Sequence, residues 1–177
     1  MQTIQAIYVA DQSGAPMCAV ESARLVAGVG IVEDRYAANS GTFSGNPGDH
    51  ELTLVEAEVI EELEATHRIS IGMNGTRRNL VTRGIRLNDL VGKRFRVGEA
   101  LCEGTRLCEP CAHLERLTGI GGLVRLMAGR GGLRAVIVES GTVRSGDTIT
   151  VLPSPPNPLP LEHRGRGLGG EGRRNDR

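Results

Sequence analysis

Three of the four cysteines in this 177-residue sequence lie within ten residues of one another, at Cys102, Cys108 and Cys111, and the fourth is Cys18. A disulfide scaffold would spread its cysteines to close long loops, and a chain of this length does not need such cross-links. Because no targeting segment is visible at the N-terminus, the sequence predicts a cytoplasmic protein with reduced thiols. Clustered thiols in a reducing compartment indicate metal or thiol chemistry.

The C-x-x-C pair Cys108 and Cys111 fits several kinds of chemistry, and its spacing alone leaves them open. Two thiols at this spacing can close a small ring in thiol–disulfide exchange, and a helix N-terminus would lower the first pKa. Together with Cys102 and His113 the pair supplies four ligands for structural zinc, although a second ligand pair of the usual kind is missing. A single thiolate could instead bind a soft transition metal or carry a persulfide. The structural alternative is two buried cysteines that pack as small apolar residues.

The run Arg77-Arg78-Asn79 is the second candidate site. Segment 77–82 is predicted as a strand, in which alternate residues face the same side, so Arg77 and Asn79 share one face and Arg78 lies on the other. A guanidinium beside an amide can hold a phosphate or the edge of a heterocycle through planar hydrogen bonds. The structural alternative is a solvent-facing strand end with ion-paired arginines.

The run Glu33-Asp34-Arg35-Tyr36 is the third candidate, within a glycine-rich loop over residues 28–48. Loops on a rigid scaffold often carry function. The structural alternative is a solvated turn in which Asp34 pairs with Arg35 or Arg83.

Short strands with glycine turns between them are the expected scaffold for these residues. Strands are predicted over residues 3–9, 17–25, 52–55, 77–82, 94–97, 100–103, 133–139 and 148–152. The clearest helix is predicted over 56–67, where Val55, Val59, Ile60 and Leu63 follow the 3.6-residue period. Shorter helical pieces are expected within 108–117 and 123–127. The pattern favours a mainly β, α+β domain, a barrel or sandwich with one or two helices, over an array of βαβ units.

Composition divides the chain in two and excludes several functions. Residues 1–152 hold the predicted elements, whereas 153–177 are rich in Pro, Gly and Arg and are expected to form a disordered tail. No apolar run is long enough to span a bilayer, so no membrane role is expected. Zero net charge and a content of two Tyr, two Phe and no Trp argue against a nucleic-acid partner. Lys93 is the only lysine, which leaves one candidate for a Schiff-base cofactor.

Taken in order, these segments resemble the MOSC domain, a family named for the C-terminal domain of molybdenum cofactor sulfurase. The resemblance covers roughly residues 3–152 and includes the turns Gly98-Glu99 and Gly146-Asp147. Its other matching runs are GIVEDRY at 30–36, ELTLVE at 51–56, RRNLVTRGI at 77–85, LVGKRF at 90–95 and RLCEPCAHL at 106–114. One departure is Glu33, which stands where members often carry Gly before the Asp-Arg pair.

The resemblance implies a β-barrel of the pyruvate-kinase-barrel-like type with helical additions. It also implies the handling of molybdenum cofactor, in sulfur transfer or in molybdenum-dependent reduction of N-oxygenated small molecules. In relatives a cysteine thirteen residues after the Gly of a Gly-Asp/Glu turn is the metal ligand or sulfur site, and Cys111 stands at that distance from Gly98. Cys108 is the neighbouring thiol.

The same resemblance assigns the remaining residues of the site. Arg77 and Asn79 match positions expected to hold the anionic pterin, and Thr82, Asp34 and Arg35 are further cofactor-binding candidates. A sulfur-transfer role implies a cysteine desulfurase as partner, a reductase role implies an electron-transfer protein, and the oligomeric state is left open. Pyridoxal phosphate is not expected, because it belongs to a separate aminotransferase-like domain in the fused sulfurases.

Two alternatives to molybdenum cofactor binding stay open at this point. One is a non-catalytic binding module stabilised by zinc on Cys102, Cys108, Cys111 and His113. The other is a sulfur carrier without a metal, with the persulfide on Cys111.

Overall fold

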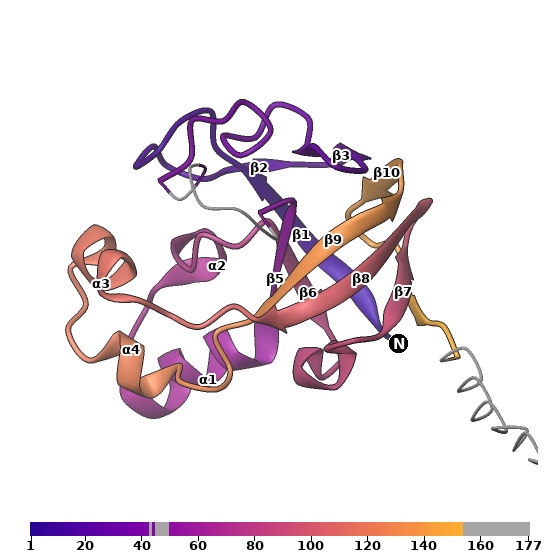
Figure 1. The fold of residues 1–177 in the computed structure, drawn as a ribbon. Coiled ribbons are helices and arrows are strands. Elements are labelled where there is room, and N and C mark those ends of the chain that lie inside the picture. Colours follow the sequence, from indigo (N-terminus) through magenta and orange to yellow (C-terminus); the bar gives the residue numbers. More distant parts are fainter. Residues whose placement is uncertain (43, 45–49, 154–177) are drawn as a thin grey trace, which may run out of the picture.

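Two β-sheets form the centre of the protein in the computed structural model, which describes residues 1–42, 44 and 50–153 (Figure 1). The larger sheet has eight strands in the order β11-β7-β8-β9-β5-β6-β1-β2. They are β1 (Thr3–Val9), β2 (Cys18–Val20), β5 (Leu52–Glu56), β6 (Leu80–Arg83), β7 (Arg94–Val97), β8 (Ala100–Leu107), β9 (Leu133–Glu139) and β11 (Ile149–Val151). The smaller sheet, in the order β10-β3-β4, contains β3 (Ser22–Val26), β4 (Gly30–Ile31) and β10 (Gly141–Arg144). The predicted tail lies outside the described residues from position 154 onward.

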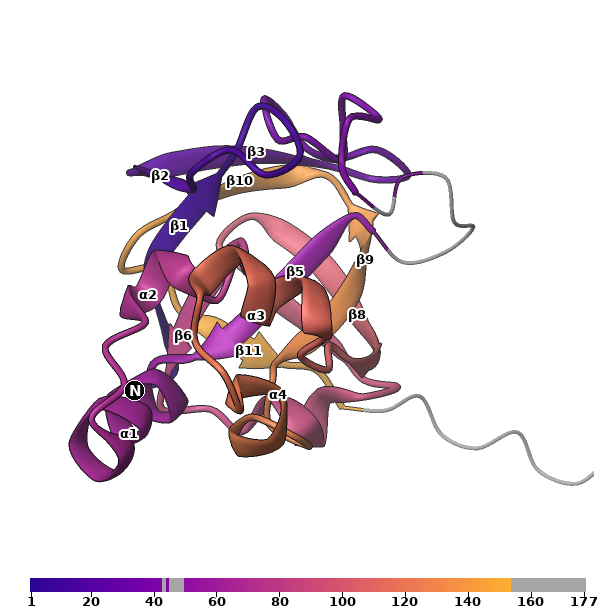
Figure 2. The same cartoon turned by 90° about the vertical axis from the view of Figure 1, so that its left-hand side faces the viewer.

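The helices of the described residues gather on one side of the larger sheet. They are α1 (Ala57–His67), α2 (Gly72–Gly75), α3 (Ala112–Thr118) and α4 (Leu123–Leu126), with a 3₁₀ turn, η1 (Leu87–Leu90). Figure 2 faces this side and shows α3 and α4 in front of the sheet. Helices α1 and α2 connect β5 to β6, which pair in parallel. None of the described helices is long and apolar enough to cross a membrane.

Two apolar clusters hold the layers together. One fills the inside of the curled sheet, where Phe95 is fully buried. The other lies between the helices and the outer face of β5 and β6, where Val55 and Val81 contact a layer that includes Leu63 and Leu114. The crossover from β5 to β6 therefore places a helical layer against the sheet, next to the loops that follow β8.

The sheet curls but does not close into a barrel. Its edges are β2, which lies beyond β1, and β11, which has three residues. An isolated bridge joins Thr3 to Thr148, and the Ile4 amide donates to the Asp147 carbonyl at 2.8 Å, so the start of β1 meets the segment before β11. The predicted mixture of strands and helices is confirmed in this coarser form, whereas the predicted barrel is not, because this contact extends over too few residues to form a strand ladder.

Most predicted elements lie where the pattern placed them. Strands β1 and β9 have the predicted bounds, and α1 begins one residue late and buries Val59, Ile60 and Leu63 as its period requires. The predicted strand over 17–25 is divided into β2 and β3, and β6 begins only at Leu80, so the predicted start at residue 77 was wrong. The described residues contain four α-helices, more than the one or two predicted, since α2 and α4 are single turns.

Candidate functional site

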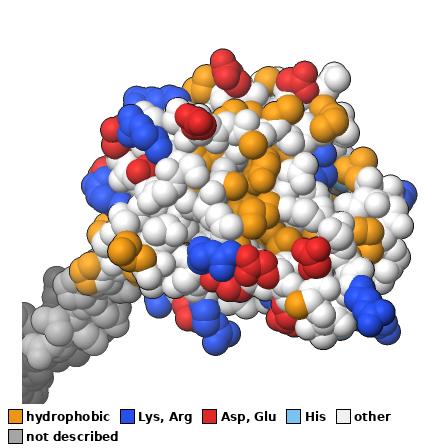
Figure 3. Space-filling model, turned by 180° about the vertical axis from the view of Figure 1, so that it is seen from behind, with side chains coloured by type: hydrophobic (Ala, Val, Ile, Leu, Met, Phe, Trp, Pro, Cys, Tyr) orange, Lys and Arg blue, Asp and Glu red, His pale blue; other side chains and the backbone are white. Residues whose placement is uncertain are grey.

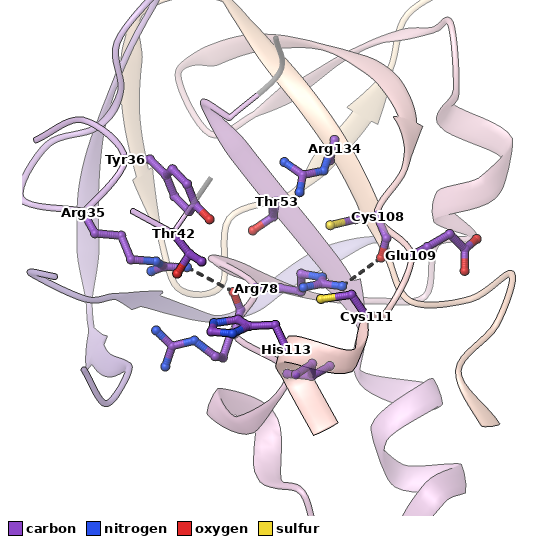
Figure 4. Close-up of a pocket in the computed structure, with 12 residues that line it drawn as sticks. Arg35, Tyr36, Thr42, Thr53, Arg78, Cys108, Glu109, Cys111, His113 and Arg134 are labelled. Atoms are coloured by element: carbon purple, nitrogen blue, oxygen red, sulfur yellow. Dashed lines mark hydrogen bonds between the residues drawn. The ribbon is translucent and has the colours of Figure 1, made fainter. Parts of the chain in front are cut away.

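A pocket opens between the glycine-rich loop after β4 and the chain that leaves β8 (Figure 4). It encloses about 590 Å³, a volume that includes the space at its open mouth. We name it the arginine pocket. Its lining residues are Arg35, Tyr36, Thr42, Thr53, Arg77, Arg78, Cys108, Glu109, Cys111, His113, Leu114 and Arg134. These residues come from six parts of the chain, so only the fold brings them together.

Two of the four arginines that line the pocket, Arg77 and Arg78, are held by backbone carbonyl oxygens. The Arg78 guanidinium donates to the carbonyl oxygens of Gly131 at 3.0 Å and Cys108 at 2.8 Å, and Arg77 donates to that of Ala15 at 2.7 Å. Within the part of the chain that the structure describes, neither arginine forms an ion pair with a carboxylate. Glu109 also lines the pocket, but its carboxylate turns away from the other side chains and accepts from the Gly129 amide (Figure 4).

Arginines on the outer surface are arranged differently. Arg94 pairs with Glu103 at 2.9 Å, and Arg96 pairs with Glu139 at 2.8 Å. Figure 3 shows basic and acidic side chains interspersed around a central apolar strip on the face opposite to that of Figure 1. The arginine pocket is therefore a local concentration of one charge in a chain with zero net charge.

Arg77 reaches the pocket from a strained turn. Its backbone has a φ of 60°, in the left-handed region, and it precedes β6. The pKa of Arg77 is lowered, chiefly by burial and then by the nearby charge of Arg35. Because Arg77 is outside the strand, the predicted alternation of faces was wrong: Arg77 and Arg78 both line the pocket, and Asn79 is not among the lining residues.

Asn79 and Asp34 belong to a buried network behind the pocket. The Asn79 side chain accepts from the Thr53 hydroxyl at 2.8 Å and donates to the Tyr8 carbonyl at 3.1 Å and to Asp34 at 3.3 Å. Asp34 also accepts from the Arg35 guanidinium at 3.0 Å and from the Ala10 amide at 3.1 Å. This network fixes Thr53 and Arg35, which do line the pocket.

Thr82, the remaining cofactor-binding candidate, lies away from the pocket. Its side chain is fully buried, and its hydroxyl donates to the Val55 carbonyl across the β5–β6 pair. We therefore expect Thr82 to stabilise the pairing of β5 and β6 and not to bind a ligand.

Arg35 and Tyr36 form one wall of the pocket. The guanidinium of Arg35 lies 4.8 Å from the centre of the Tyr36 ring, at a distance typical of cation–π contact. The Tyr36 ring in turn stacks on His50, with 5.6 Å between ring centres. Arg35 and His50 therefore both pack against the Tyr36 ring and hold it in place at the pocket wall.

The two thiols of the pocket come from one loop, residues 108–111, which we name the thiol loop. Cys108 is 2% exposed, whereas Cys111 is exposed and precedes α3 with extended backbone. The Cys108 amide donates to the Gly132 carbonyl at 2.8 Å, and Arg78 holds the Cys108 carbonyl. A side chain at Gly131 would lie 2.7 Å from that same carbonyl oxygen and 2.6 Å from Pro110. The loop is thus clamped between an arginine and two glycines.

The predicted zinc site is wrong in its ligand set. Cys102 lies in β8 with no exposed surface and packs within the sheet core, where burial and then the charge of Glu51 raise its pKa to about 12. Cys108, Cys111 and His113 line the pocket without it. Among the residues that the structure describes, no group of three or more His, Cys, Asp or Glu side chains could hold a metal ion.

Glu33, the departure from the family pattern, has a left-handed backbone with a φ of 68°. Since glycine adopts this conformation without strain, Glu33→Gly is expected to raise the free energy of unfolding by about 0.5–1 kcal/mol, after the greater freedom of glycine in the unfolded chain is deducted. Urea unfolding measures the change. Asp11→Gly, at an exposed position without positive φ, is the control and is expected to lower stability. A loss of stability in both variants would contradict the prediction.

Arg134 and Thr53 line the pocket but were not predicted as site residues, whereas Arg78 and Tyr36 lay within candidate runs without being assigned a role. A signal existed for Arg134, which interrupts the otherwise apolar start of β9 at Leu133–Glu139. The predicted strand register assigned Arg78 to the opposite face. Thr53 carried no signal, because only the fold brings its strand to the thiol loop.

Comparison with known proteins gives one family and several similar folds. The family model described as the MOSC domain matches residues 37–150. The solved YuaD protein from Bacillus subtilis superposes with a TM-score of 0.71 at 18% identity, over 85% of this chain and 96% of that one. YiiM from Geobacillus stearothermophilus gives 0.67 at 15% identity (86% and 76% covered), and YiiM from Escherichia coli gives 0.65 at 19% (86% and 70%). A search of curated proteins finds no match. At these identities the structural likeness shows the fold alone.

Proposed function

Because this chain belongs to the MOSC domain family, we propose that its arginine pocket binds molybdenum cofactor and that Cys111 is the thiolate that ligates the metal or carries its sulfur. One observation carries the proposal. Arg77 and Arg78, held by backbone carbonyls and without carboxylate partners among the described residues, line the same pocket as the thiols of Cys108 and Cys111. The pocket therefore combines unneutralised cations with soft sulfur donors.

The chemistry of the pocket suits that of the group. Molybdenum cofactor has a flat pterin with several hydrogen-bonding edges, an anionic phosphate and a soft metal centre. Guanidinium groups bind phosphate and heterocycle edges through planar forks, and thiolates prefer soft metals. Arg77 and Arg78 would hold the anionic part, and Cys111 would reach the metal. When bound, the cofactor supplies a redox-active molybdenum centre.

Asp34 and Asn79 take a different role in this proposal from the one the resemblance implied. Both are almost fully buried, and their side-chain hydrogen bonds are already formed within the protein. They act as positioning residues that keep Arg35 and Thr53 at the pocket wall. Arg35, although paired with Asp34, retains the Tyr36 contact.

The experiment compares metal and pterin content in protein made in a host that synthesises the cofactor. Wild type is expected to carry molybdenum and pterin, and Cys111→Ala is expected to lose molybdenum by more than the roughly 10-fold that loss of an outer-shell partner typically causes. Cys18→Ala, at an exposed cysteine outside the arginine pocket, is the matched control and is expected to resemble wild type.

The outcomes separate the versions of the proposal. Equal, near-zero molybdenum in wild type and Cys111→Ala would overturn the metal-ligand role. Sulfur uptake from a cysteine desulfurase supports sulfur transfer, with the desulfurase as partner. A protein that holds molybdenum but takes up no sulfur would favour reduction of N-oxygenated substrates with an electron-transfer protein as donor.

A further inference from the structure

Cys108 is a buried thiol that packs in neither apolar core. Cys102 is part of the cluster inside the sheet, whereas Cys108, at 2% exposure, is absent from both clusters. It lines the arginine pocket instead, where Figure 4 shows it beside Thr53 and above Cys111. A buried cysteine usually packs as a small apolar residue, but Cys108 lines the arginine pocket together with Cys111.

The backbone of the thiol loop is held in place at Cys108. Arg78 and the Gly131–Gly132 segment grip the backbone of Cys108 from two sides. Cys111 follows three residues later, at the exposed end of the same loop. An exposed thiol can take up sulfur from a sulfur donor. A second thiol three positions earlier in the chain can then attack it and form a disulfide, since thiol–disulfide exchange at this spacing closes a small ring.

We propose that Cys108 is the resolving thiol for a persulfide on Cys111, an inference that rests on the sulfur-carrying version of the proposed function. The Cys108 thiolate attacks Sγ of Cys111 in the persulfide Cys111–S–SH. The bond between the two persulfide sulfurs breaks, and the outer sulfur leaves as hydrosulfide while a Cys108–Cys111 disulfide forms. The outer sulfur is reduced to sulfide by the two electrons that the cysteine pair loses, and the Cys108 proton passes to solvent. A low-molecular-weight thiol then reduces the disulfide.

The arginines line the pocket in which this step takes place. Each anion in the sequence, the attacking thiolate and the departing hydrosulfide, is formed in a pocket where Arg77 and Arg78 lack carboxylate partners among the described residues. Both anions carry one negative charge, so the same cations accompany the charge from the attacking thiolate to the departing hydrosulfide. The sulfide is released where the cofactor is proposed to bind, and not into bulk solvent.

The test loads the thiols with sodium tetrasulfide in a Cys18→Ser background, which removes the other exposed cysteine. After desalting, acid-quenched intact mass and free sulfide are measured over time. The parent is expected to release sulfide and to become lighter than the dithiol by two hydrogens. Cys108→Ser is expected to keep one added sulfur on Cys111 and to slow sulfide release by roughly tenfold or more, until an external thiol is added.

Two results would overturn the inference, and they differ in what they say of the proposed function. A persulfide equally stable in the parent and in Cys108→Ser would remove the resolving role and leave sulfur carriage intact. No persulfide in either protein would remove both. As a second measurement, oxidation of the parent with diamide is expected to give a Cys108–Cys111 disulfide in a peptide map. Failure to form this disulfide in folded protein would show that the two sulfurs do not meet.

Discussion

Gly132→Ala is expected to lower the free energy of unfolding by about 3 kcal/mol or more, because two unfavourable effects coincide at this position. Gly132 has a φ of 116°, which a residue with a side chain rarely adopts. A Cβ atom there would also overlap the Leu54 carbonyl oxygen of β5 and lie 3.5 Å from Nε of Arg78. The backbone of β5 is paired on both sides, to β6 and β9, and cannot move away cheaply.

Urea unfolding of Gly132→Ala against Gly121→Ala measures this effect. At Gly121 no heavy atom lies within 4 Å of the point that a Cβ atom would occupy, and φ is not positive, so its replacement is expected to change stability by less than about 0.5 kcal/mol. The Gly132 carbonyl also accepts from Cys108, so the less stable variant should show faster alkylation of that thiol. A loss below about 1 kcal/mol would mean that β5 and the thiol loop adjust to the methyl group.

Local patterns predicted the fold where one face of an element is buried. Strand β9 alternates buried and half-buried residues, and α1 repeats its apolar residues with the helical period, so both could be found from the sequence. Whether the sheet closes into a barrel could not be predicted in this way. It depends on how β1 meets the segment before β11, a contact between residues more than 140 positions apart that leaves no periodic signal.

The candidate site was predicted best where its chemistry is rare and worst where its residues are common. Cysteines are few, so the spacing of Cys108 and Cys111 was informative, and both line the pocket. Asn79 and Asp34 were also predicted to bind the cofactor, yet they form a buried network, because a polar residue that satisfies another polar residue looks in sequence like one that binds a ligand. Arg134 was missed although it interrupts the apolar start of β9, because arginines are common throughout the chain.

Left-handed backbone conformations at two residues that are not glycine could not be predicted from the sequence. Glu33 stands at a position whose left-handed backbone favours glycine, so the conformation explains the glycine expected there and not the glutamate. The positive φ of Arg77 ended the strand register that would have placed it beside Asn79. Backbone conformation at single residues therefore decided which side chains reach the pocket.

Arg78→Met is expected to lower the free energy of unfolding by about 3 kcal/mol and to abolish most cofactor retention. Arg78 is 9% exposed, and its guanidinium donates to the carbonyl oxygens of Thr76, Gly131 and Cys108. Hydrogen bonds from a charged donor contribute about 1.5–3 kcal/mol each, and water that enters the open pocket replaces part of the loss. Methionine has about the volume of the arginine methylene chain, so the substitution removes the guanidinium group and little else.

The measurements are urea unfolding and molybdenum content of protein from a cofactor-competent host. Arg96→Met is the matched control, because Arg96 is half exposed and pairs with Glu139 on the surface. Such exposed pairs contribute at most about 1 kcal/mol, so this control is expected to retain stability and cofactor. Molybdenum content in Arg78→Met is expected to fall by about tenfold or more, the scale of losing one positioning partner around a metal site.

Arg78→Lys separates the charge of Arg78 from its geometry. Lysine keeps the positive charge but presents a point donor in place of a planar fork, so it cannot bridge three carbonyl oxygens at once. If the fork sets the position of the thiol loop, Arg78→Lys should lose stability and molybdenum nearly as far as Arg78→Met. If charge alone matters, the lysine variant should resemble wild type in molybdenum content, and the role of Arg78 in holding the Cys108 carbonyl would have to be abandoned.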